Sequence, residues 1–143
     1  MKKTEKRLVK TRTRAARPYP ASSFNEAVPL GAAIHQFASG QRVRRLTLLG
    51  QMQKSPNSGA TKMLITNSGK YGITTGSHAA EWLALTPAGS TGTEPGPLSR
   101  GKLQAQFSLA IEGVGPFAQL YTEYKSKKLP TQEVMKDSCA RLV

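Results

Sequence analysis

The residues that could do acid–base or nucleophilic chemistry are few in this chain. It has two histidines, His35 and His78, one cysteine, Cys139, and one aspartate, Asp137. Nucleophilic catalysis needs a base within hydrogen-bond reach of the nucleophile and a third group that orients the base. A metal site needs several ligands at short, regular spacing. Neither pattern is present, so we predict that the protein is not an enzyme and binds no metal.

Two glycine-rich segments match phosphate-binding motifs only in part. Residues 96–102 have the spacing of a phosphate loop as far as Lys102, but Leu103 follows where a hydroxyl must hold magnesium, and Pro97 removes a backbone donor. Residues 113–118 fit a relaxed dinucleotide fingerprint, but a helical pattern precedes them and too little chain follows for a βαβ unit. We therefore expect turns in both places, and no cofactor.

The charge of the chain points to a polyanionic partner. Its 143 residues include 21 Lys and Arg against 8 Asp and Glu, which gives a net charge of +13. Residues 1–20 hold eight of these cations against Glu5 alone. Because residues 1–18 have too little apolar surface to offset chain entropy by burial, we predict a disordered basic arm there. Nucleic acid is the expected partner of Arg12, Arg14 and Arg17 in this arm, and a tail that only improves solubility is the alternative.

The elements that would position a binding surface begin after Pro20. Ser23 and Glu26 have the spacing of a capping box, and an apolar stripe of helical period continues from there to a stop near Gly40. A second, short helix is expected over 42–49. A third is expected over 58–71, with Ser58 at its N-terminus.

Beyond Gly72 the apolar period changes from helical to alternating. Residues 73–75 and 81–86 are predicted to form two strands joined by a loop, and residues 90–100, rich in Gly, Pro, Ser and Thr, a linker. Residues 101–143 carry further helical patterns. The predicted fold is thus mainly α with a small β-hairpin (α+β), a winged helix-turn-helix over 19–89 followed by a C-terminal helical extension over 101–143.

In a helix-turn-helix protein, the second helix of the motif enters the major groove of DNA. Here that helix is 58–71, and a helical wheel places Lys62, Ile65 and Thr66 toward solvent, opposite Leu64 and Tyr71. The recognition residues that we predict are Ser58, Thr61, Lys62, Ile65, Thr66 and Lys70. Phosphate contacts are predicted for Arg42, Arg44, Arg45 and Lys54, and minor-groove contacts at the wing for Ser77 and His78.

Several short segments between Tyr19 and Pro130 also carry a resemblance. They are Tyr19–Ala27, Arg45–Leu49, Lys54–Gly59, Leu64–Thr66, Lys70–Gly72, Leu85–Gly89 and Gln106–Pro130. On these residues the chain resembles a group of uncharacterised prokaryotic winged-helix-like proteins. The resemblance implies a winged-helix fold with a helical C-terminal part, and it implies no catalytic residues.

Two functions fit these observations. The first is a small cytoplasmic or nucleoid-associated DNA-binding protein that reads duplex DNA through helix 58–71, acting in transcriptional regulation or as a nucleoprotein accessory factor. The second is an interaction module that uses Ile65 and the C-terminal helices for a homodimer or protein partner and has only non-specific affinity for nucleic acid. An RNA-binding role is less favoured, because aromatic residues, which stack on unpaired bases, make up only 6% of the chain. No apolar stretch is long enough for a membrane helix.

Overall fold

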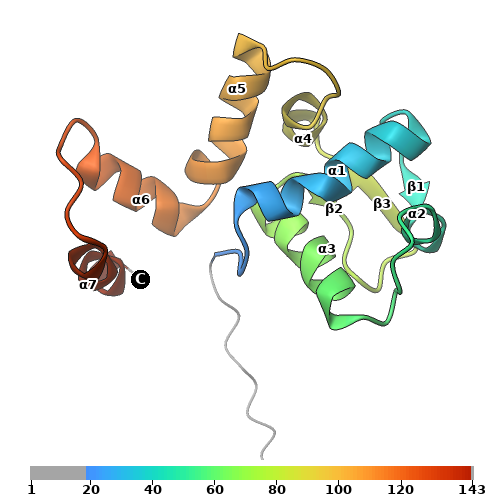
Figure 1. Ribbon diagram of the computed structural model, residues 1–143, viewed down its shortest axis with the longest axis horizontal. Helices are drawn as coiled ribbons and strands as arrows, with labels where there is room; N and C mark the ends of the chain where they lie inside the picture. The colour runs from blue at the N-terminus through green and yellow to red at the C-terminus, as the bar shows by residue number, and fades with distance from the viewer. Residues whose placement is uncertain (1–18, 143) are drawn as a thin grey trace, which may run out of the picture.

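The computed structural model describes residues 19–142, and within them the protein is mainly helical with one small antiparallel sheet (Figure 1). This confirms the α+β class. The elements, in chain order, are α1 (Phe24–Ala38), β1 (Val43–Arg44), α2 (Arg45–Gln51), α3 (Gly59–Tyr71), β2 (Thr74–Thr75), β3 (Trp82–Leu85), α4 (Pro87–Gly92), α5 (Arg100–Phe107), the π-helix η1 (Ser108–Glu112), α6 (Gly115–Tyr124) and α7 (Gln132–Leu142).

Helix α1 begins and ends where the sequence predicts. The Ser23 hydroxyl accepts a hydrogen bond from the Glu26 N–H at 3.3 Å, and the Glu26 carboxylate accepts one from the Ser23 N–H at 3.0 Å. This reciprocal capping box satisfies two backbone donors that the first turn of a helix leaves free. At the other end Ser39 takes the left-handed conformation, and Gly40 follows with φ of +76°.

The segment predicted as one helix over 42–49 is divided. Val43 and Arg44 form strand β1, which pairs with Leu83 and Trp82 of β3, and α2 starts only at Arg45. The sheet therefore has three strands in the order β1-β3-β2 rather than two. A two-residue strand is too short to show an alternating period, so pairing with a distant strand outweighs the local helical pattern.

The predicted hairpin is confirmed as β2 and β3, which pair antiparallel with Thr74 opposite Leu85. Gly76, at the start of the loop that joins them, has φ of +103°. A β-carbon on this residue would lie 2.6 Å from the carbonyl oxygen of Trp82. The turn therefore needs glycine both for its backbone conformation and for the close approach of the neighbouring strand.

A turn of helix follows β3, where the sequence suggests only the end of a strand. The Thr86 hydroxyl accepts from the Gly89 N–H at 2.9 Å and donates to the Gly72 carbonyl, so it caps α4 and ties it to the end of α3. Gly89 lies against the carbonyl oxygen of Ile73, which a β-carbon would approach to 2.0 Å. Helix α4 extends to Gly92, so residues 90–92 of the predicted linker belong to a helix. This helix packs on α5.

Two clusters of buried side chains hold the fold together. The first joins α1, α2, α3 and β3 through Leu30, Ala33, Ile34, Leu48, Leu49, Ile65 and Leu83. The second joins the start of α1 and the end of α3 to the C-terminal segment through Ala27, Tyr71, Ile73, Leu109 and Val114. The first part of the C-terminal extension is therefore packed into the same body as the helices before it.

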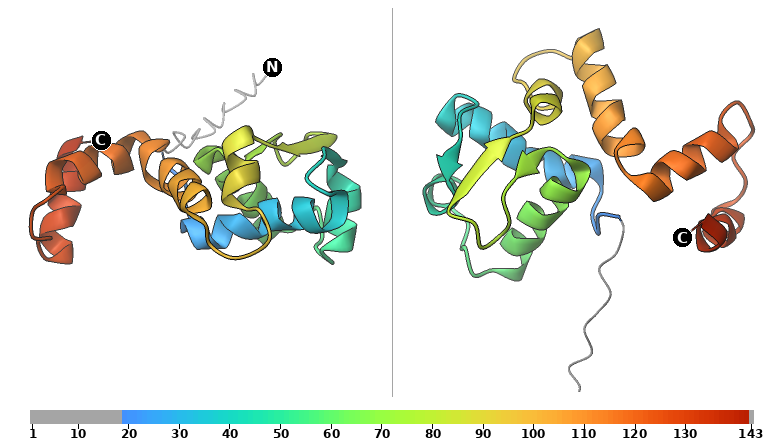
Figure 2. Two further views of the ribbon diagram at one scale, coloured as in Figure 1. Left: turned by 90° about the horizontal axis from the view of Figure 1, so that it is seen from above. Right: turned by 180° about the vertical axis from the view of Figure 1, so that it is seen from behind.

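The remaining helices extend away from this body. Figure 2 shows α6 and α7 projecting from the side at which α5 and η1 pack, so that the molecule is elongated. Helix α6 packs on η1 and α7, and none of its residues is buried. No helix in the part of the chain that the structure describes is long and apolar enough to cross a bilayer.

Candidate nucleic-acid interface

Helix α3 is turned about its axis relative to the sequence prediction. Two residues predicted to face DNA are in the core, because Ile65 is 1% exposed and Thr61 is 4% exposed. Ile65 packs with the apolar side chains of α1, α2 and β3. Both residues are therefore removed from the candidate interface, and Ile65 is removed from any partner-binding surface.

The prediction was wrong because the buried face of α3 is partly polar. The Ser68 hydroxyl donates to the Ala27 carbonyl at 2.8 Å, and the Asn67 side-chain oxygen accepts from the Ala21 N–H at 3.0 Å. Buried polar groups with such partners lose little on leaving water. The helical wheel placed Tyr71 on the buried face correctly, but the buried face also includes Thr61, Ile65 and Ser68.

These bonds also fix the segment that leads into α1. The Tyr71 hydroxyl donates to the Ser22 carbonyl at 2.7 Å, and Pro20 is buried. Burial raises the pKa of the Tyr71 hydroxyl above its ordinary value of 10.0, and the negative charge of Glu26 raises it further. The first described residues are therefore fastened to the C-terminal half of α3. The predicted contact residues Arg12, Arg14 and Arg17 lie outside the described residues.

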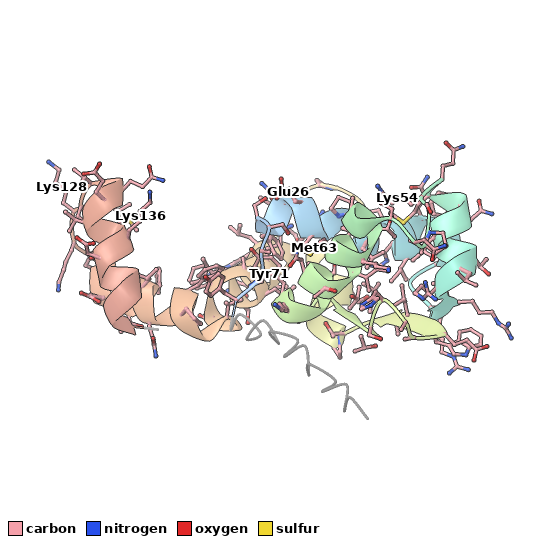
Figure 3. The ribbon with its side chains drawn as sticks, turned by 90° about the horizontal axis from the view of Figure 1, so that it is seen from below. Glu26, Lys54, Met63, Tyr71, Lys128 and Lys136 are labelled. Atoms are coloured by element: carbon pink, nitrogen blue, oxygen red, sulfur yellow. The ribbon has the colours of Figure 1, made fainter. Side chains whose placement is uncertain are left out.

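The exposed face of α3 carries Lys62, Met63 and Lys70, with Thr66 half-buried at its edge. Figure 3 looks onto this side of the molecule, with Met63 near the middle of α3. Met63 is 46% exposed and was not among the predicted site residues, because methionine is more common in cores. Ser58 stands at the predicted N-cap position, but its side chain makes no capping bond.

The three predicted arginines lie together beside the sheet but differ in their contacts. The Nε of Arg45 donates to the Ala80 carbonyl at 2.8 Å, so this side chain fastens the loop before β3 to the start of α2. The guanidinium carbon of Arg42 lies 4.3 Å from the centroid of the Trp82 ring, and that of Arg44 lies 5.2 Å away. Arg44 also pairs with Glu81 at 3.6 Å. Sequence analysis did not predict a role for Trp82.

The remaining predicted residues lie on exposed loops. Lys54 follows α2, and Figure 3 shows it beside α3. His78 is exposed in the loop between β2 and β3, where the Ser77 hydroxyl accepts from the Ala79 N–H at 3.2 Å. The other histidine, His35, lies elsewhere, with its Nε2 2.9 Å from the Ser90 carbonyl oxygen.

Acidic residues are absent from most of this surface. Between Glu26 and Glu81 the sequence contains no aspartate or glutamate. All six basic residues of that stretch are candidate site residues: Arg42, Arg44, Arg45, Lys54, Lys62 and Lys70. Such a surface attracts polyanions. Among residues 19–137, whose side chains the structure describes, no three His, Cys, Asp or Glu side chains lie close enough to hold a metal ion.

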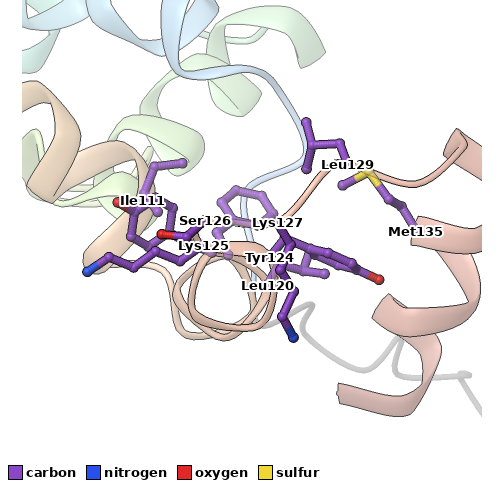
Figure 4. A pocket seen from close by; sticks show the side chains of 10 residues that line it. Ile111, Leu120, Tyr124, Lys125, Ser126, Lys127, Leu129 and Met135 are labelled. Carbon is purple, nitrogen blue, oxygen red and sulfur yellow. The ribbon is translucent and has the colours of Figure 1, made fainter.

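A second feature is a groove between α6 and α7, shown in Figure 4. It has a volume of about 600 Å³ and is lined mainly by apolar side chains. Its lining residues are Ile111, Phe117, Leu120, Tyr121, Tyr124, Lys125, Ser126, Lys127, Leu129 and Met135. It lies at the far end of the molecule from α2, with Lys128 and Lys136 near it in Figure 3.

Comparison of the chain with protein-family models, with curated proteins and with solved structures finds no match.

Proposed function

We propose that the protein binds duplex DNA as a winged helix-turn-helix protein. The observation that carries the proposal is the acid-free stretch between Glu26 and Glu81, whose six cations lie on or beside α2, α3 and the sheet. The order α1-β1-α2-α3-β2-β3 and the sheet order β1-β3-β2 support it. In helix-turn-helix proteins the second helix of the motif lies in the major groove, and α3 holds that place here.

In this proposal the exposed face of α3 faces the base edges. Lys62 reaches guanine or a phosphate, Thr66 donates or accepts a hydrogen bond, and Met63 offers apolar contact to a thymine methyl. The loop with Ser77 and His78 is the wing. Lys54 and Lys70 contact phosphates, which hold the protein on the duplex without reading its sequence.

The basic arm adds affinity that does not depend on sequence. Ala21 and Ser22, which follow this segment in the sequence, are hydrogen-bonded to α3, the proposed recognition helix. A tethered basic segment binds the same duplex at high effective concentration. The expected role is that of a transcriptional regulator or a nucleoprotein accessory factor, and the expected location is the cytoplasm or nucleoid.

The experiment is fluorescence anisotropy with labelled duplex DNA over a salt series. We expect the logarithm of the association constant to fall linearly with the logarithm of salt concentration, with a slope of about −0.9 for each phosphate neutralised. Lys62→Gln should reduce the magnitude of the slope by about 0.9, the contribution of one phosphate contact. The matched control is Lys128→Gln, at the far end of the molecule, which should leave it unchanged. Absence of duplex binding at low salt would refute the proposal.

A second candidate function, self-association through the groove between α6 and α7, is favoured by the apolar residues exposed there. Leu129, which lines the groove, is 64% exposed, and Val134, on α7 but not among the lining residues, is 50% exposed. Helices as short as α6 and α7 depend on packing for stability. The described part of this region balances Glu123, Glu133 and Asp137 against Lys125, Lys127, Lys128 and Lys136, whereas the whole chain carries +13. With four cations against three anions, this region repels a second copy only weakly, which makes a second copy the fitting occupant.

Sedimentation equilibrium over a range of protein concentrations tests this candidate. We expect a reversible dimer that Leu129→Ser with Val134→Ser abolishes. The control is Leu46→Ser, which changes a 61% exposed leucine on α2 and should leave the dimer intact. A monomer at all concentrations would contradict it without bearing on DNA binding.

A further inference from the structure

The side of the sheet formed by β1 and β3 carries two arginines against one aromatic ring. Trp82 is 37% exposed. The guanidinium carbons of Arg42 and Arg44 lie 4.3 Å and 5.2 Å from its ring centroid. Both distances are within the range of cation–π attraction, about 6 Å from the ring centroid. One ring therefore holds two positive charges near each other.

The backbone places these three side chains together. Arg44 is the antiparallel partner of Trp82 across β1 and β3. Arg42 comes two residues before Arg44, and alternate residues of an extended segment share a face. The start of β3 is held by two bonds from Arg45, because its N–H donates to the Glu81 carbonyl at 2.9 Å and its Nε to the Ala80 carbonyl at 2.8 Å. The arginine pair thus stands on a braced part of the fold.

The charges of this cluster are only partly balanced. The Glu81 carboxylate lies 3.6 Å from Arg44, and their side chains are 67% and 61% exposed, so the pair is weak and open to exchange. No carboxylate pairs with Arg42 among the described residues. An anion that bridges both guanidinium groups would relieve their mutual repulsion.

We propose that Arg42, Arg44 and Trp82 form a phosphate-binding site, and that its ligand is a backbone phosphate of duplex DNA. Each planar guanidinium can donate two parallel hydrogen bonds to phosphate oxygens, and stacking on the ring limits the rotamer freedom lost on binding. The site stands at the base of the β2–β3 loop, so it would hold the duplex beside that loop. It rests on the proposed DNA-binding function, and free inorganic phosphate is the other source of the same chemistry.

The chain contains one tryptophan, so its emission reports this site directly. The full-length protein is titrated with duplex DNA and, separately, with inorganic phosphate, while tryptophan emission and the anisotropy of labelled DNA are followed. We expect duplex DNA to change the emission, and phosphate at equal concentration to have no effect. Arg42→Gln with Arg44→Gln should weaken duplex binding at least about tenfold. The same variant should reduce the magnitude of the salt slope by the contribution of about two phosphate contacts.

Three further variants separate phosphate contact from damage to the fold. Arg42→Lys with Arg44→Lys keeps the charge but not the forked donors, so the slope should persist while affinity falls. Trp82→Phe keeps a ring and should bind within about twofold of the unchanged chain, whereas Trp82→Ala should bind more weakly. Arg100→Gln with Lys102→Gln, on α5, removes two cations away from α3 and should leave the salt slope unchanged.

The outcomes distinguish this site from the function on which it rests. Duplex binding with an unaltered slope in the Arg42→Gln, Arg44→Gln variant would overturn the phosphate site and leave the proposed function standing. A response to inorganic phosphate that the same variant abolishes, without duplex binding, would support the anion site and refute its assignment to DNA. Absence of any response to either ligand would overturn both.

Discussion

Replacing Ile65 by alanine tests the orientation of α3, on which the candidate interface depends. Ile65 is 1% exposed and lies in the first core with Leu48, Leu49 and Leu83. Truncating a buried isoleucine loses transfer free energy and leaves a cavity, and we expect a cost of about 3 kcal/mol within the usual range of about 2–5 kcal/mol. This is a large part of the total stability of a domain, which is about 5–15 kcal/mol. For a domain of this size each 1 kcal/mol lowers the melting temperature by about 3–4 °C, so we expect a fall of about 10 °C.

The assay is urea unfolding of the full chain followed by far-ultraviolet circular dichroism. Met63→Ala is the matched control, because Met63 lies on the same helix and is 46% exposed. We expect that control to change the free energy of unfolding by no more than about 0.5 kcal/mol. The sequence prediction, which places Ile65 toward DNA, requires the opposite. If Ile65→Ala left stability unchanged and Met63→Ala lowered it by several kcal/mol, the orientation of α3 described here would be refuted.

Three other changes probe the rest of the fold. Gly89→Ala should lower the free energy of unfolding by at least about 3 kcal/mol, because its β-carbon would meet the Ile73 carbonyl oxygen at 2.0 Å; urea unfolding measures this, and a neutral result would contradict the close contact. Leu109→Ala should cost about 2–4 kcal/mol in a single calorimetric transition, since Leu109 is buried between α3 and η1; a separate transition for residues 101–142 would contradict it. Folding raises the pKa of Tyr71, so the unfolded chain loses this proton first as the pH rises. The contribution of Tyr71 to the free energy of unfolding is therefore present below pH 10 and lost above it. Chemical unfolding at pH 9 and 11 should show a smaller loss of that free energy in Tyr71→Phe than in the unchanged chain.

Sequence patterns were sufficient for the long, locally determined elements. The capping box of Ser23 and Glu26 sets the start of α1, and the glycines at 40 and 72 follow the ends of α1 and α3. These signals act within a few residues of the backbone groups that they satisfy. For the same reason, the alternating period over 81–86 predicted strand β3, which the structure has at Trp82–Leu85.

The features that sequence patterns missed depend on contacts between distant residues. Strand β1 exists because it pairs with β3. The buried face of α3 includes Ser68 because the Ala27 carbonyl accepts its proton. After α5 the π-helix η1 changes the register of the helical pattern, and Leu109 is buried while Leu103 is 53% exposed.

The same reasoning explains why the candidate interface cannot be separated from the C-terminal segment. The proposed recognition surface needs α3 in one rotation about its axis, and the end of that helix is held by Tyr71. Tyr71 is buried against Leu109 and Val114, which come after the segment predicted as a linker, and its hydroxyl binds the carbonyl of Ser22. The position of Ser22, the direction of α3 and the first part of the extension are therefore fixed by one cluster. A change that loosens this cluster should weaken DNA binding and stability together, whereas a change at Lys62 or Arg42 should weaken DNA binding alone.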